Sequence, residues 1–114
     1  MIATLLALAV AALHLWFLVL EMLLWEQPRT RKLFSTTEAF AAETKVMAAN
    51  QGLYNGFLAA GILLGLWRDP FLLAFALACV VVAGLYGALT VGPRVALVQA
   101  LPAALALGAL AAGL

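Results

Sequence analysis

Long apolar runs, separated by short polar or proline-containing segments, divide the chain into four parts. Each run has about the 20 mostly apolar residues that a helix needs to cross a membrane. The predicted membrane-spanning helices are residues 2–25, 45–67, 70–90 and 95–114. We therefore expect an all-α membrane protein, with one domain over residues 1–114 that forms a compact bundle of four transmembrane helices.

Prolines mark the connections between these helices. Pro28 ends the first run, because proline lacks a backbone donor and restricts the residue before it. Pro70 follows Arg68 and Asp69 in a tight turn, at a position suited to the first turn of a new helix. Pro93 has the same place before the last run. The connections are therefore short, apart from the segment after Pro28.

A short interfacial segment is expected before the second membrane helix. Ser35 followed by Glu38 is the pattern of a capping box, in which two side chains satisfy the first free N–H groups of a helix. The helix would then begin near Thr36, lie along the membrane surface over residues 36–44, and enter the bilayer after that.

Composition supports a membrane protein. Of the 114 residues 68% are hydrophobic and 10% charged, whereas a soluble domain is about half apolar and about a quarter charged. The net charge of +1 says nothing about nucleic acid, but no basic cluster is long enough to bind it, so nucleic acid is not expected as a partner. Cys79 is the only cysteine, so one chain holds no disulfide and no thiolate metal site. We expect no cofactor and no metal, and the lipid bilayer as partner.

Basic residues gather on one side of the predicted bundle. Five flank the first and third connections, and one stands at the second. The five are Arg29, Arg31, Lys32, Lys45 and Arg94, and the single one is Arg68. Cytoplasmic loops carry an excess of Lys and Arg. Loops 26–44 and 91–94 are therefore predicted to be cytoplasmic, and both termini are predicted to lie outside.

Polar side chains recur at similar depths in the predicted helices. Every span has at least one in its cytoplasmic half, and the outer half has almost none. Such groups usually face a bundle interior or a wet cavity, where they pair. We predict one shared polar cluster of His14, Glu21, Asn50, Gln51, Tyr54, Asn55, Tyr86 and Gln99. The aromatic side chains of Trp16, Phe17, Trp25 and Phe57 would line it.

The second predicted helix combines this polar set with small residues. Gly52 and Gly56 form a G-x-x-x-G pattern, and such small faces let helix backbones approach closely. The third helix has similar faces at Gly84 and Gly87. We interpret them as packing faces within the chain, with a contact in a homo-oligomer as the alternative. One specific expectation follows: Gln51 or Asn55 lies within hydrogen-bonding reach of Glu21 or His14.

Several motifs resemble the bacterial family called "domain of unknown function 1304". They are the run from His14 to Met22 with Trp25, the basic segment from Pro28 to Lys32 with Phe34, "NQGLYNGFLAAG" from Asn50 to Gly61, and the later "AGLYGALT" and "VQALPA". The resemblance covers nearly the whole chain, and the run from Asn50 to Gly61 is its most specific part. It implies a small four-helix protein of a bacterial inner membrane and brings no established activity.

Glu21 is the candidate for chemistry, because it is the only acid inside a predicted span. An intramembrane carboxyl group is expensive to place and suits proton exchange or cation binding. His14, seven residues earlier and so about two turns away on the same face, is interpreted as a hydrogen-bonded partner rather than a metal or haem ligand. The alternative is that both are structural, with the amides acting only as links between helices.

Three classes of function remain open. The first is a transporter or permeation unit for a small polar or cationic solute, with Glu21 as the coupling acid. The second is an intramembrane enzyme for a lipid-like or isoprenoid substrate, with Glu21 or His14 as general acid or base. The third is an accessory membrane subunit. No nucleophile, phosphate-loop or dinucleotide motif is present, and whether the protein is an enzyme stays open.

Overall fold

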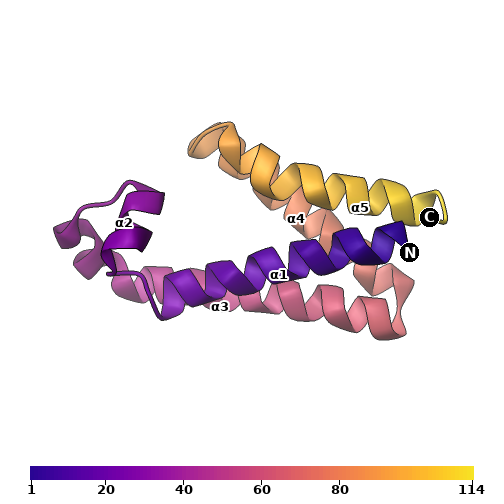
Figure 1. The fold of residues 1–114 in the computed structure, drawn as a ribbon, viewed down its shortest axis with the longest axis horizontal. Helices are drawn as coiled ribbons and strands as arrows, with labels where there is room; N and C mark the ends of the chain where they lie inside the picture. Colours follow the sequence, from indigo (N-terminus) through magenta and orange to yellow (C-terminus); the bar gives the residue numbers. More distant parts are fainter. The chain divides into compact units, whose positions relative to one another are not determined.

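The computed structural model describes all 114 residues, and every regular element in it is helical (Figure 1). The elements in order are α1 (Ile2–Met22), α2 (Pro28–Phe34), α3 (Glu38–Arg68), α4 (Pro70–Thr90), a π-helical segment η1 (Ala96–Ala100) and α5 (Leu101–Ala111). The chain divides into two compact units. The first unit combines residues 1–12 with 58–114, and the second consists of residues 13–57.

The predicted bundle of four transmembrane helices is wrong. Only α1 and α4 are long and apolar enough to cross a membrane. The polar residues of the run from Asn50 to Asn55 make α3 less apolar, although it is 31 residues long. The apolar stretch Ala96–Ala111 is shorter than the length that a span needs. The chain therefore has five α-helices, two of which can cross a membrane.

The connection between α1 and α3 also differs from the prediction. Its residues include the helix α2, which begins with Pro28 and ends where Ser35 takes the left-handed conformation, with φ of 55°. Ser35 therefore cannot cap the next helix. Thr37 does so instead, because its Oγ1 accepts a hydrogen bond from the backbone N–H of Phe40 at 3.1 Å. From Glu38 onwards α3 is one uninterrupted helix, with no separate interfacial segment.

The first unit has an apolar core built mostly from small and branched residues. Ile62 of α3 and Leu77 and Val80 of α4 are completely buried in it, together with Val10 of α1. Asp69 caps α4 by accepting a hydrogen bond from the N–H of Phe71, with Pro70 in the first turn. The predicted turn at residues 68–70 and the predicted range 70–90 of this helix are thus confirmed.

Glycines bring the helices of the first unit close together. A Cβ atom on Gly65 would overlap the backbone nitrogen of Leu73, and one on Gly84 would lie 2.6 Å from the backbone nitrogen of Ala100.

The segment η1 precedes Pro102, which lacks the N–H that an α-helix would use there. The backbone N–H of Leu101 instead bonds the carbonyl of Ala96, five residues earlier.

The glycine contacts predict a large effect of one methyl group. Gly65→Ala should lower the free energy of unfolding by about 1–3 kcal/mol, because the backbone of Leu73 cannot yield as a flexible side chain would. Gly108→Ala is the matched control, since its Cβ would meet nothing within 4 Å. It should stabilise α5 by about 0.5–1 kcal/mol. Chemical unfolding in one detergent, followed by circular dichroism, measures both, and equal effects would contradict the prediction.

Candidate functional site

In the second unit α1 and α3 pack closely through the predicted glycine face. A Cβ atom on Gly52 would lie 2.6 Å from Cγ of Met22, 3.1 Å from Cβ of Glu21 and 3.2 Å from the carbonyl oxygen of Leu18. One on Gly56 would lie 2.6 Å from Cδ1 of Leu18. The two glycines therefore pack against α1 within the chain, as predicted, and bring the polar side chains beside them into range of Glu21.

Glu21 and Asn55 form the centre of the candidate site. The Asn55 Nδ2 atom donates a hydrogen bond to Glu21 Oε1 at 2.6 Å. The same Nδ2 atom donates to the backbone carbonyl of Gln51 at 3.2 Å, which holds the amide group in place. The prediction that Gln51 or Asn55 reaches Glu21 or His14 is confirmed by this contact. Hydrogen bonds to a charged group are among the stronger ones in proteins.

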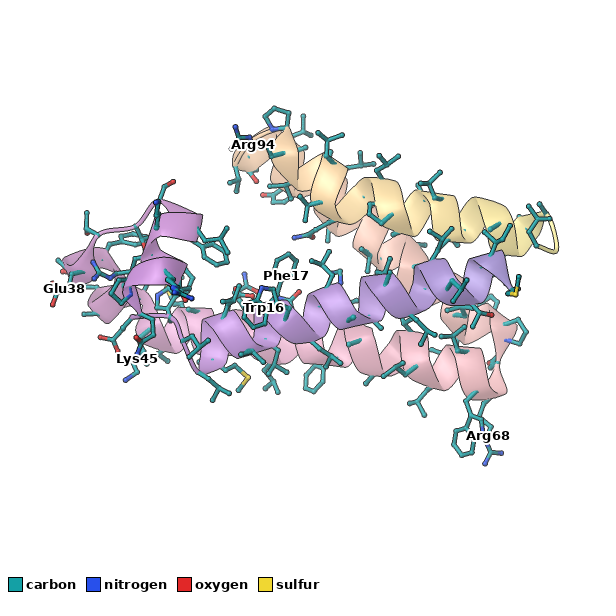
Figure 2. The ribbon with its side chains drawn as sticks, in the orientation of Figure 1. Trp16, Phe17, Glu38, Lys45, Arg68 and Arg94 are labelled. Atoms are coloured by element: carbon teal, nitrogen blue, oxygen red, sulfur yellow. The ribbon has the colours of Figure 1, made fainter.

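His14 is a fully buried polar group of α1. Its side chain is only 1% exposed, which makes it one of the largest fully buried side chains of the protein. Its ring meets that of Phe17 edge to face, with centroids 5.7 Å apart. Phe17 and its neighbour Trp16 both project from α1 (Figure 2). His14 thus lies two turns before Glu21 on the same face of one helix.

The other predicted members differ in their surroundings. Asn50, Gln51 and Tyr54 have exposed side chains on α3. Tyr86 and Gln99 belong to the first unit, and Tyr86 is 69% exposed. Within the second unit, the structure joins Glu21 and Asn55 of the predicted set by a hydrogen bond.

The four side chains of the predicted aromatic lining lie in different surroundings. Trp16 is 51% exposed and Phe57 is 60% exposed, with the Phe57 ring 6.1 Å from that of Tyr54. Trp25 lies beyond the end of α1, because α1 ends at Met22 and the chain turns before Pro28. Its ring packs instead against Phe34 of α2, with centroids 5.1 Å apart.

Two contacts that the sequence did not indicate hold the turn after α1 to the start of α3. The Trp25 Nε1 atom donates a hydrogen bond to Thr44 Oγ1 at 3.1 Å. Lys45 Nζ lies 3.2 Å from Glu26 Oε1 in an exposed ion pair. Lys45 therefore pairs with Glu26 and not with Glu21. A turn at residues 23–27 had to be known before either partner could be recognised.

A separate open apolar face lies in the first unit. It is formed by residues of α4 alone: Phe75, Ala78, Cys79, Val82, Ala83 and Tyr86. These positions recur at the three- and four-residue spacing of one helix face. Cys79 is partly exposed there as a free thiol.

Comparison with known proteins identifies the family. The family model described as "Protein of unknown function (DUF1304)" matches residues 8–111. The chain belongs to this family, and the resemblance of its motifs is thereby confirmed. No curated protein and no solved structure matches the chain.

The contact between Glu21 and Asn55 can be measured by a double-mutant cycle. Glu21→Ala and Asn55→Ala should show a coupling of about 1.5–3 kcal/mol in the free energy of unfolding, as expected for a hydrogen bond to a charged group. Gln51→Ala is the control, because its exposed side chain forms no hydrogen bond while its backbone carbonyl remains. It should change stability by less than about 0.5 kcal/mol. Additive effects of the two main substitutions would refute the contact.

Proposed function

We propose that this protein is a membrane protein in which the Glu21–Asn55 pair binds and releases a proton or a small cation, as part of a transporter or permeation unit. The observation that supports this most is the hydrogen bond of 2.6 Å between the two side chains, on a helix that is long and apolar enough to cross a membrane. A carboxyl group is seldom placed in such a helix without a function.

The hydrogen bonds of the pair determine which ligand it suits. An asparagine side chain has two donors on its nitrogen and one acceptor oxygen. The nitrogen of Asn55 donates to Glu21 Oε1 and to the carbonyl of Gln51. What the pair can still offer a ligand is oxygen, from Glu21 Oε2 and from Asn55 Oδ1. Oxygen ligands without further donors favour a proton or a hard cation over an anion.

The charge of the surroundings points the same way. Lys45, the nearest base along the start of α3, forms its ion pair with Glu26. No lysine or arginine forms an ion pair with Glu21 in the structure. A carboxylate whose charge is balanced only by an amide dipole attracts a positive partner more strongly than one already paired with a base.

Membrane placement is supported by the exposed surfaces of α1 and α4. Only 28% of the apolar 18-residue stretch of each helix is buried inside the protein. The core helix of a soluble protein would have most of its apolar side chains buried instead. Large exposed apolar surfaces of this kind mark contact with lipid or with another protein.

Flux measurements in liposomes test the proposal. The full chain is reconstituted, and proton or Na⁺ entry is followed with an internal dye while a potassium diffusion potential drives it. We expect flux above that of protein-free liposomes, and its loss in Glu21→Gln, because the neutral amide can neither release a proton nor balance a cation. Asn55→Leu should weaken it, because the carboxylate then lacks its donor.

Glu26→Gln is the matched control. It removes one acid of the same chain, from an exposed ion pair instead of the site, and should leave the flux unchanged. Circular dichroism spectra serve to check that each variant keeps its helices. Flux that is absent in the parent protein, or equal in the parent and Glu21→Gln, would overturn the proposal in favour of an enzyme or an accessory subunit.

A further inference from the structure

The short helix α2 has an inner and an outer face of different character. On its inner face Thr30 is only 3% exposed, and the ring of Phe34 packs against Trp25. On its outer face Arg29 and Lys32 are exposed. Leu33, about one helical turn after Arg29, is 64% exposed. The helix is therefore fixed by its inner side chains and presents two cations and one apolar side chain outwards.

The two outer cations have no acidic partner in the chain. Glu26, the nearest acid before α2, is taken by Lys45 at 3.2 Å. Arg31 is directed back along the chain, because its Nε atom donates to the backbone carbonyl of Glu26 at 3.2 Å. The sequence of α2, PRTRKLF, contains no acid. Arg29 and Lys32 are thus free to meet an external anion.

The position of α2 along the chain suggests where that anion lies. α2 begins six residues after α1 ends at Met22, and 21 residues of α1 rise about 31 Å, which matches the hydrocarbon core of a bilayer. If α1 spans the membrane, as the proposed function requires, α2 lies at the level of the headgroups. Trp25, which packs on α2, has the amphipathic ring that prefers this level.

We propose that the outer face of α2, formed by Arg29, Lys32 and Leu33, binds the headgroups of anionic lipids. The two cations complement the negative surface, and Leu33 can enter the boundary between headgroups and acyl chains. An acidic protein segment would complement the charges but would leave Leu33 without an apolar partner. Each basic residue close to an anionic surface contributes about a fivefold preference for it.

Energy transfer from Trp25 to labelled lipids tests this face. In a Trp16→Phe, Trp67→Phe background, Trp25 is the only tryptophan. The full chain is reconstituted in phosphatidylcholine vesicles with an equal small fraction of pyrene-labelled phosphatidylglycerol or pyrene-labelled phosphatidylcholine. We expect several-fold more efficient transfer to the anionic lipid, a lower ratio at high salt, and a ratio near one in Arg29→Gln, Lys32→Gln.

Arg68→Gln is the matched control, because it removes an exposed cation of the first unit. In the parent chain this guanidinium lies over the ring of Trp67. This substitution should leave the ratio unchanged. A ratio of one in the parent protein, or an equal ratio in the double variant, would overturn the inference. A ratio of one together with binding of polyglutamate by the detergent-solubilised chain would overturn it in favour of an acidic protein partner.

Vesicle flotation separates this inference from the proposed function on which it rests. A chain that fails to float with uncharged phosphatidylcholine vesicles is not inserted, and both proposals then fail. A chain that floats with them, conducts protons or Na⁺ and shows no enrichment of anionic lipid would refute only the lipid-binding face of α2.

Discussion

Within each unit, two helices come close together where one of the two has a glycine, which has no Cβ atom. In the second unit Gly52 admits the carbonyl of Leu18 and the side chains of Glu21 and Met22, and any larger residue would overlap them. The hydrogen bond between Glu21 and Asn55 depends on this approach, because both side chains are short and their helices must lie close together. Packing of small residues is therefore a condition for the polar site, and not a separate feature of the fold.

The local contacts were largely predictable from the sequence, and the number of spans was not. Glycine spacing predicted the packing of Gly52 and Gly56 against α1. The polar positions of the two helices predicted that Gln51 or Asn55 reaches Glu21 or His14, and the structure shows this contact between Asn55 and Glu21. The count of four spans failed because a run of polar residues between Asn50 and Asn55 reduces the hydropathy of α3 and because the apolar stretch Ala96–Ala111 is too short. Hydropathy of a whole window and the function of a few positions within it are different properties.

The contact between Glu21 and Asn55 depends on direction around the helix as well as on depth. Depth along neighbouring helices indicates which side chains could meet, but it leaves open the direction in which a side chain points around its helix. Asn50 and Tyr54 lie on the exposed side of α3, while Asn55, one residue after Tyr54, points towards α1. Successive residues are about 100° apart around a helix, so a shift of one position separates a buried partner from an exposed one.

The π-helical turn at Ala96–Ala100 has a consequence for helical phase. Val95 packs on Gly87 of α4, and Ala100 packs on Gly84. In an α-helix, residues five apart would point about 140° away from each other, so both could not face α4. The wider π turn, closed by a hydrogen bond between residues five apart, takes up more residues per turn than an α-helix and so brings Ala100 closer to the direction of Val95. The turn thus acts as a one-residue correction of phase, and it lets one α4 surface hold the chain on both sides of the interruption.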